Sequence, residues 1–265
     1  MSPTSLALPP GSDVLTIAGL SKTFGQGASA VQANKSVDLI ARSGQVTCLL
    51  GHNGAGKSTI VNQVVGIAAP DSGSITLTTR DGSPVNAIAH PARARELTSV
   101  QAQANVPITG LTPRKAINLV GRIRGARRRD MEPRTDHILR SLDMEEWADK
   151  PSQKVSGGVA RLTAVAMALA VPGQLVVLDE PTNDVDPVRR RHLWRLIRET
   201  ADAGAAVLVV THNVVEAQSV VDNIYLLDAG SVIAQGSPAE IIALAQAQND
   251  GHVANLEDAY VSLVG

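Results

Sequence analysis

The segment from Gly51 to Ser58 has the residue spacing best suited to chemistry. Gly51 and Gly56 are separated by four residues, and a lysine and a serine follow directly. Glycines let the backbone wrap closely around an anion, so that successive N–H groups point inward at phosphate oxygens. A lysine at this place reaches the β- and γ-phosphates, and a serine hydroxyl holds Mg²⁺. The spacing predicts a nucleoside triphosphate site formed by Gly51, Asn53, Gly54, Ala55, Gly56, Lys57, Ser58 and Thr59.

Two carboxylates, Asp179 and Glu180, directly follow the apolar run Leu175–Leu178. A strand ending here would deliver Asp179 beside the phosphate loop, where it can orient Mg²⁺ through water. Glu180 would lie one residue further, toward the γ-phosphate, where a carboxylate can polarise an attacking water. Many strands end in acidic residues, so this pattern is informative only together with the phosphate loop. The loop alone does not distinguish ATPases from GTPases or kinases, so that distinction must come from the rest of the chain.

The hydrophobic pattern predicts the strands and helices that position these residues. Gln45–Leu50 is a nearly continuous apolar run, typical of a buried parallel strand, and it leads into the phosphate loop. A helical pattern from Lys57 to Val65 follows, so the loop joins a strand to a helix N-terminus, as phosphate binding requires. Other strands are predicted at Val14–Leu20, Val37–Ile40, Ser74–Thr79, Leu175–Leu178 and Ala206–Val210, with a hairpin at Ile224–Leu227 and Val232–Ala234.

Helical patterns occupy most of the remaining chain. The polar, arginine-rich stretch Thr112–Trp147 is interpreted as a helical insertion, and further helices are predicted at Arg161–Ala170, Val188–Ala201 and Pro238–Ala247. Short buried strands therefore alternate with helices, and polar residues gather where the strands end. This order is typical of an α/β fold with a parallel sheet whose ligands bind at the carboxyl edge.

Composition narrows the class of protein. The 265 residues suffice for one large domain, or for a domain with a small subdomain, and 44% of them are apolar. A net charge of −1 and an aromatic content of 2% weigh against nucleic-acid binding, so no nucleic acid is expected as a partner. No apolar stretch reaches the roughly 18–20 residues that span a membrane, so any membrane role is expected to need another chain.

The segment Val155-Ser156-Gly157-Gly158-Val159 resembles the L-S-G-G-Q signature of ATP-binding cassette (ABC) transporters. It precedes an alanine-rich helix and lies upstream of the acidic strand, as in that family. Glu180 to Pro187 resembles the family's link from catalytic glutamate to D-loop, and Thr211-His212 its switch histidine. The resemblance covers nearly the whole chain from Val14. It implies ATP and Mg²⁺ as ligands and an α/β fold: a P-loop NTPase core with a parallel sheet, an antiparallel β subdomain and an inserted α-helical subdomain.

The resemblance implies a site shared by two subunits. Lys57, Glu180 and His212 would be catalytic within one subunit, with His212 contacting the γ-phosphate and the attacking water. Ser58, Gln103 and Asp179 would surround Mg²⁺. The face formed by Ser156, Gly157 and Gly158 would meet the γ-phosphate held by a second subunit, so that two subunits enclose two ATP molecules. Asp186 would lie at the subunit boundary, near the partner's phosphate loop.

Two assignments near the nucleotide also come from the resemblance. Phe24, the only phenylalanine, falls where the family places an aromatic residue that stacks on adenine, and Val31 would line the other side of the base. Gln103 fits the spacing of the family's glutamine that touches Mg²⁺ and water and whose loop carries a signal to the transmembrane partner. Gln101 remains an alternative for that role.

Two departures from the signature affect the expected activity. Val155 replaces the usual leucine, and Val159 replaces the usual glutamine. The hydroxyl of Ser156 and both glycines remain, so phosphate binding is expected to remain. The missing side-chain amide is expected to weaken contact with the partner's nucleotide, which points to reduced or asymmetric hydrolysis.

The expected organisation is a flexible N-terminus (1–12), an ATPase domain (13–245) with a helical subdomain inserted at about 104–160, and a C-terminal tail (246–265). The ending from Leu256 to Gly265 resembles the L-E-D-x-F-x-x-L-x-G ending of drug and polysaccharide exporter ATPases, with Tyr260 in the aromatic position. We therefore expect an ATPase subunit that powers a separate transmembrane permease, as an exporter. It would pair with a second ATPase subunit and be cytoplasmic, peripheral on the inner face of the cell membrane.

Two other functions remain open from the sequence. One is a soluble ABC ATPase without a permease, although the long coiled coil or second cassette of some such proteins is missing. The other is a regulatory nucleotide-binding module with weak turnover, an alternative motivated by Val159. Neither the transported substrate nor the identity of the second subunit follows from the residues.

Overall fold

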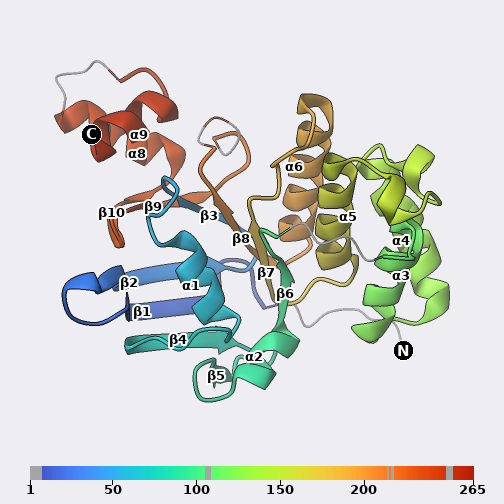
Figure 1. Ribbon diagram of the computed structural model, residues 1–265, viewed down its shortest axis with the longest axis horizontal. Coiled ribbons are helices and arrows are strands. Elements are labelled where there is room, and N and C mark those ends of the chain that lie inside the picture. Colours follow the sequence, from blue (N-terminus) through green and yellow to red (C-terminus); the bar gives the residue numbers. More distant parts are fainter. Residues whose placement is uncertain (1–7, 105–108, 214, 216–217, 249–252) are drawn as a thin grey trace.

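The phosphate loop follows a strand in the middle of a six-stranded sheet (Figure 1). The structure, a computed structural model, describes residues 8–104, 109–213, 215, 218–248 and 253–265. The strand order is β10-β9-β3-β8-β7-β6, and all neighbours are parallel except the β9–β10 hairpin. The carboxyl ends of β3, β7 and β8 therefore share one edge. The strands are β3 (Val46–Leu50), β6 (Thr98–Gln101), β7 (Leu175–Asp179), β8 (Ala206–Thr211), β9 (Asn223–Asp228) and β10 (Ser231–Gly236).

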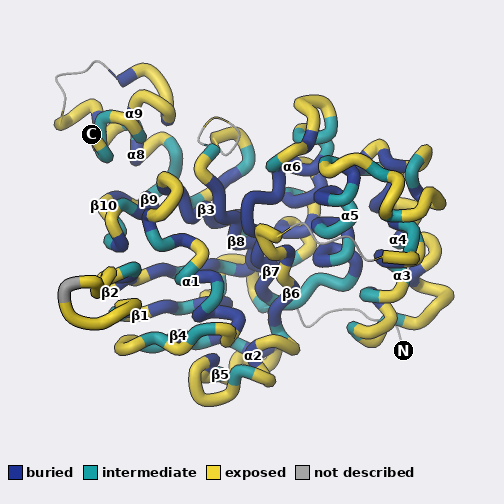
Figure 2. Tube along the Cα trace, viewed as in Figure 1, coloured by how far each residue is buried: buried dark blue, intermediate teal, exposed yellow. Residues whose placement is uncertain are grey.

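The two faces of this sheet bury separate apolar clusters. Along β3, Val46, Cys48 and Leu50 belong to one cluster and Leu49 to the other, and β7 and β8 alternate in the same way. Because helices or a second sheet cover both faces, these strands are buried along their whole length (Figure 2). This double burial explains why they occur in the sequence as continuous apolar runs.

A second, antiparallel sheet has the order β2-β1-β4-β5. Its strands are β1 (Asp13–Phe24), β2 (Val31–Arg42), β4 (Ser72–Thr78) and β5 (Pro84–Asn86). The first two are longer than the predicted Val14–Leu20 and Val37–Ile40, because their pairing continues to Phe24 opposite Val31. A short 3₁₀ turn at Gly27–Ser29 joins them. The exposed outer part of this hairpin lacks the apolar alternation that marks its inner part.

Helices surround the two sheets and connect their strands (Figure 1). Helix α1 directly follows the phosphate loop, while α3 and α4 lie in the arginine-rich stretch and pack against each other and against α5. The division of the chain into domains at 104–160 and 246–265 stays a prediction. The helices are α1 (Lys57–Val64), α2 (Pro91–Leu97), α3 (Pro113–Ile123), α4 (Arg128–Ser141), α5 (Gly157–Ala170), α6 (Pro187–Asp202), α8 (Pro238–Gln248) and α9 (Leu256–Val264).

The last part of the chain, expected only as a tail, contains helix α9. Asn255 caps its N-terminus by accepting from the N–H groups of Glu257 and Asp258. Leu256 and Ala259 are buried in the larger apolar cluster, and α9 packs against α8. In the part of the chain that the structure covers, no helix is long and apolar enough to cross a membrane.

Candidate functional site

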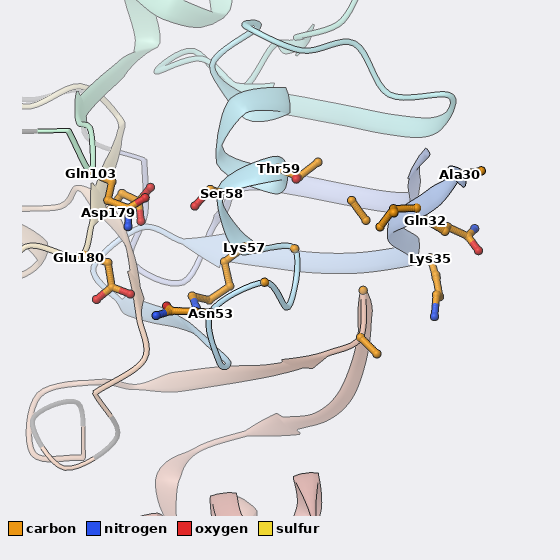
Figure 3. A pocket seen from close by; sticks show the side chains of 16 residues that line it. Ala30, Gln32, Lys35, Asn53, Lys57, Ser58, Thr59, Gln103, Asp179 and Glu180 are labelled. Atoms are coloured by element: carbon orange, nitrogen blue, oxygen red, sulfur yellow. The ribbon is translucent and has the colours of Figure 1, made fainter. Parts of the chain in front are cut away.

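A cavity of about 790 Å³ lies above the phosphate loop (Figure 3). Asp179, Glu180 and Gln103 lie at one end, and Ala30, Gln32 and Lys35 lie at the other. Lys57 and Ser58 extend between these ends from the start of α1. Of the residues assigned from the sequence, those that line the cavity are Val31, Asn53, Gly54, Gly56, Lys57, Ser58, Thr59, Gln103, Asp179 and Glu180.

Two glycines of the phosphate loop are required by close backbone packing. A Cβ atom on Gly56 would lie 2.2 Å from the carbonyl oxygen of Ala33, and its φ is +107°. A Cβ atom on Gly51 would lie 2.3 Å from the carbonyl oxygen of Leu227. Gly51 and Ala55 are buried and do not line the cavity. These two residues therefore shape the loop from behind, while Gly54 and Gly56 form its open side.

Lys57 is a buried cation inside the loop. Its side chain is 6% exposed, and its ammonium group donates to the carbonyl oxygens of Gly51 at 2.6 Å and His52 at 3.0 Å. Burial lowers the pKa of Lys57, while Glu180 and Asp179 act against that change. A cation held by two neutral carbonyls and facing a cavity is well placed to pair with a phosphate group.

The residues assigned to the metal supply hard oxygen donors at the cavity. Ser58 offers a hydroxyl, Gln103 an amide and Asp179 a carboxylate, the ligand types that Mg²⁺ prefers. Burial and the neighbouring charge of Glu180 raise the pKa of Asp179 to about 6, although Lys57 partly offsets this. A divalent cation here would stabilise the ionised carboxylate.

The donor set fits an ion that is completed by the nucleotide. Among the described residues, no group of three or more histidine, cysteine, aspartate or glutamate side chains could hold a metal ion alone. Mg²⁺ is usually bound through one or two protein groups together with water and substrate phosphates. Ser58, Gln103 and Asp179 therefore suit a magnesium–nucleotide complex better than a free metal ion.

The two candidate glutamines occupy different environments. Gln103 lines the cavity, whereas Gln101 ends β6, is 2% exposed and lies outside the cavity lining. The amide of Gln101 donates to the carbonyl oxygen of Asp179 at 3.1 Å, so it supports the acidic strand end from behind. This placement favours Gln103 for the role near Mg²⁺.

Glu180 is held by two neighbours from the end of β8. Its Oε1 lies 2.8 Å from Nδ1 of His212, and its Oε2 accepts from the hydroxyl of Thr211 at 3.1 Å. With the carboxylate ionised, Nδ1 of His212 carries the proton and donates it. The Glu180 side chain is 4% exposed and that of His212 is 47% exposed, so the histidine forms the open side of the pair. Such a pair can orient and deprotonate a water molecule beside the cavity.

Several assigned residues lie away from the cavity. Ser156 caps α5 by accepting from the N–H of Val159 at 3.3 Å, and Asp186 caps α6 in the same way. Phe24 is 48% exposed and lies opposite Val31 in the β1–β2 hairpin, but only Val31 lines the cavity. The structure therefore does not bring Phe24, Ser156, Gly157, Gly158 or Asp186 to the cavity of their own subunit.

Val159 has an environment that the sequence did not indicate. Its side chain is 4% exposed and packs in the larger apolar cluster, so it does not lie on an open surface. It is the third helical residue after the Ser156 cap, the position from which a glutamine can return a hydrogen bond to the cap. A valine at this position cannot make that hydrogen bond, but its side chain packs in the apolar cluster.

Other residues at the site belong to no motif that the sequence analysis recognised. Ala229 and Gly230 line the cavity, and the N–H of Gly230 donates to the carbonyl oxygen of Ala55 at 3.0 Å. Arg161 is 4% exposed and donates to the carbonyl oxygen of Gln103 at 2.7 Å, joining α5 to the Gln103 loop. The Asp228-Ala229-Gly230 turn could be predicted from the sequence, but the contact of Gly230 with Ala55, about 175 residues earlier, could not.

Known proteins similar to this chain match over most of its length. Residues 34–183 match the family model described as ABC transporter. Nod factor export ATP-binding protein I of Sinorhizobium fredii is 34% identical over 232 residues, which are 87% of this chain and 65% of that protein. The corresponding protein of Ralstonia nicotianae is 33% identical over 86% of this chain and 68% of its own length. Mouse ATP-binding cassette sub-family A member 9 is 30% identical, and this chain spans 14% of its length.

Solved structures give the same result for the fold. An ATP-binding subunit of an ABC transporter superposes with a TM-score of 0.80 at 25% identity, covering 94% of this chain and 99% of that one. A dimeric ATP-binding cassette in a post-hydrolysis state with ADP and Pi superposes with a TM-score of 0.73 at 24% identity, covering 84% and 98%. The expected α/β fold with a P-loop NTPase core is confirmed, and the chain belongs to the ABC transporter family.

Proposed function

We propose that this chain is the ATP-binding and ATP-hydrolysing subunit of an exporter and that it powers a separate transmembrane permease. The observation that carries this proposal is the cavity in which Lys57 and Ser58 face Asp179 and Glu180. It combines a phosphate cradle, oxygen donors for Mg²⁺ and a candidate base in one place. Relatives named as export ATP-binding proteins favour transport over a soluble cassette or a regulatory module. The chain would act on the inner face of the membrane.

The hydrolytic site is proposed to form between two subunits. Ser156 and Gly157 are exposed at the start of α5 and do not line the cavity of their own chain. A helix N-terminus is suited to bind an anion, and the capping hydroxyl of Ser156 can still donate its own hydrogen to one. The γ-phosphate of a nucleotide held by a second subunit would be that anion. Lys57, Ser58, Asp179, Glu180 and His212 would then act within one subunit, and Ser156 would act on the nucleotide of the other.

The substitution Glu180→Gln tests the proposed reaction. The amide keeps the size of the side chain but cannot accept a proton from water, so ATP binding should persist while multiple-turnover hydrolysis is nearly lost. ATP should then hold two subunits together as a stable dimer, which size-exclusion chromatography would detect. Glu199→Gln, at an exposed position of α6, serves as the control and should behave like the unmodified protein. Hydrolysis by Glu180→Gln close to that of the unmodified protein would refute the role of Glu180.

A further inference from the structure

A second cavity, of about 640 Å³, lies between α6 and the segment that follows β8. Outside α6, the described residues that line it are Ser219 and Val220, which lie shortly before β9, and none of the residues that line the first cavity takes part. Among the described residues around it, four can carry positive charge and none is a carboxylate. Its lining consists of Pro187, Val188, Arg190, Arg191, His192, Trp194, Arg195, Ser219 and Val220.

The arginines at this cavity differ from the other arginines of α6. Arg189 pairs with Asp143 and Asp186, and Arg198 pairs with Asp202 and Asp222. Arg191 and Arg195, in contrast, are exposed and have no carboxylate partner within the described ranges. The guanidinium of Arg195 instead lies 2.7 Å from Nδ1 of His192. Among the described residues, no carboxylate therefore compensates the charge of Arg191 and Arg195, whereas carboxylates pair with Arg189 and Arg198 of the same helix.

The wall of the cavity is apolar. Trp194 is 6% exposed and belongs to the larger apolar cluster, while Val188 is 55% exposed at the edge. Pro187 and Val220 complete this apolar part. A cavity of a few hundred cubic ångströms with an apolar wall and a few charged groups is typical of small-molecule sites. Two cations beside such a wall select a ligand that has an acidic head and an apolar body.

We propose that this cavity binds a small amphipathic anion, with a carboxylate or phosphate head against Arg191 and Arg195 and an apolar body along Trp194 and Val188. The residues that line this cavity follow Glu180 and His212 closely in the chain. Helix α6 begins directly after Asp186, and Ser219 follows His212 in the same connection. A bound anion would thus hold the start of α6 together with Ser219 and Val220. The predicted effect on turnover rests on the proposed ATPase function, while the binding itself does not.

The tryptophan content allows a direct test of binding. The chain has two tryptophans, so Trp147→Phe leaves Trp194 as the only reporter. Octanoate and octyl phosphate each supply an acidic head with an apolar body, whereas octanol lacks the head and inorganic phosphate lacks the body. Titration with the first two should change Trp194 fluorescence saturably, and the other two should bind at least about tenfold more weakly. The stronger of octanoate and octyl phosphate identifies a carboxylate or a phosphate source.

A double substitution tests the arginines. Arg191→Gln with Arg195→Gln should weaken binding of both amphipathic probes by about tenfold or more, as expected for the loss of charge-assisted hydrogen bonds. The matched control, Arg128→Gln with Arg129→Gln, removes two exposed arginines of α4 and should leave binding unchanged. Circular dichroism establishes that both variants fold. Equal binding of octanol, or saturable binding that survives the Arg191 and Arg195 substitutions, would overturn the proposal.

Two further measurements distinguish the anion site from the proposed ATPase function and from a contact between subunits. Octanoate or octyl phosphate should change kcat for ATP hydrolysis with little change in KM, and only when Arg191 and Arg195 are present. If the protein hydrolysed no ATP, the proposed function would fail while the Trp194 titration could still succeed. If the double substitution altered dimer formation in sedimentation without altering probe binding, the arginines would serve contact with a second copy, and the anion site would be refuted.

Discussion

At the scale of single residues, Glu180 shows how the fold positions the carboxylate proposed to be catalytic. Its φ is +51°, a left-handed conformation that a residue with a side chain adopts at a cost of about 1 kcal/mol or more. The N–H of Glu180 donates to the carbonyl oxygen of Val210 at 2.8 Å, which holds this backbone in place. Thr211 and His212 then occupy the two carboxylate oxygens. The strand end thus sets both the direction of the side chain and its hydrogen bonds.

Thr211 is predicted to position Glu180. The substitution Thr211→Val removes the hydroxyl that donates to Oε2, while keeping the buried volume. A hydrogen bond to a charged group contributes about 1.5–3 kcal/mol, so kcat for ATP hydrolysis should fall by about 10- to 100-fold with KM little changed. Thr200→Val, which removes another buried hydroxyl on α6, is the matched control and should leave kcat unchanged. Equal kcat values in the two variants would rule out this role for Thr211.

Asp179 is predicted to destabilise the fold in the absence of a cation. Its pKa is raised from 3.8 to about 6, so the folded state holds a proton that the unfolded state has already released at that pH. Stability should therefore fall as pH rises from about 4 to 6 and stay lower above that range. Asp179→Asn removes this effect and should raise the free energy of unfolding by about 1–3 kcal/mol at about pH 8, but little at about pH 4.

Urea denaturation at the two pH values, with a chelator present, measures this difference. Asp149→Asn, at an exposed site, is the control and should change stability little at either pH. A gain for Asp179→Asn that is the same at about pH 4 and about pH 8 would contradict the ionisation argument.

At the scale of elements, the start of α5 depends on a close contact with the loop after β7. A Cβ atom on Gly158 would lie 2.4 Å from the carbonyl oxygen of Asp184, whereas one on Gly157 would have its nearest neighbour at 3.9 Å. Gly158→Ala should therefore cost about 1–3 kcal/mol of unfolding free energy or shift α5 away from this loop. Gly157→Ala, the adjacent control, should be neutral within a few tenths of a kcal/mol. Equal losses in urea denaturation would show that the contact with Asp184 does not require Gly158.

The elements that the sequence predicts best are the strands that are buried along their whole length. Strands β3, β7 and β8 are buried on both faces, so their apolar runs and the polar residues after them place Lys57, Asp179 and Glu180 correctly on one edge. Strand β6 was missed, because its burial is interrupted by exposed Val100 within only four residues. Helix α9 was missed as an element, since its buried positions are few and the packing partner is α8.

The site residues that sequence patterns did not predict are those held by contacts between segments far apart in the chain. Arg161 donates to the backbone carbonyl of Gln103, and Gly230 donates to that of Ala55 in the phosphate loop. Every residue has a backbone carbonyl, so the sequence does not show which one will accept such a bond. Trp194 and Arg195 belong to a helix whose amphipathic pattern was predicted, but the cavity beside them also depends on where Ser219 and Val220 lie. A periodic pattern gives the face of an element, whereas a cavity also requires the position of the facing element.

At the scale of the whole molecule, the distribution of the motifs over the surface favours a pair of subunits. The cavity collects Lys57, Ser58, Asp179 and Glu180, which are proposed to act on the nucleotide within one chain, while Ser156 and Gly157 are exposed elsewhere. Because one chain cannot bring its own α5 to its own cavity in this structure, a single subunit should bind ATP but hydrolyse it slowly. Hydrolysis per subunit should then rise with protein concentration as dimers form.

Mixing two inactive variants tests the pairing directly. Glu180→Gln disables the subunit that holds the nucleotide, and Ser156→Asp should disable the face offered to the partner by repelling its γ-phosphate while still capping α5. Each variant alone should be nearly inactive. In a mixed dimer one site combines an intact Glu180 with an intact Ser156, so an equal mixture should recover roughly a quarter of full activity, since about half of the dimers are mixed and each has one working site.

The control mixture combines Glu180→Gln with Lys57→Ala, whose defects both lie in the subunit that holds the nucleotide. Every site in that mixture contains a disabled cavity, so no activity should return. The two mixtures therefore differ only in whether the second defect acts within a subunit or across the pair. Recovery with Ser156→Asp and none with Lys57→Ala would locate Ser156 on the partner's nucleotide, whereas equal behaviour of the two mixtures would place the whole reaction within one chain and remove the physical reason for a dimer.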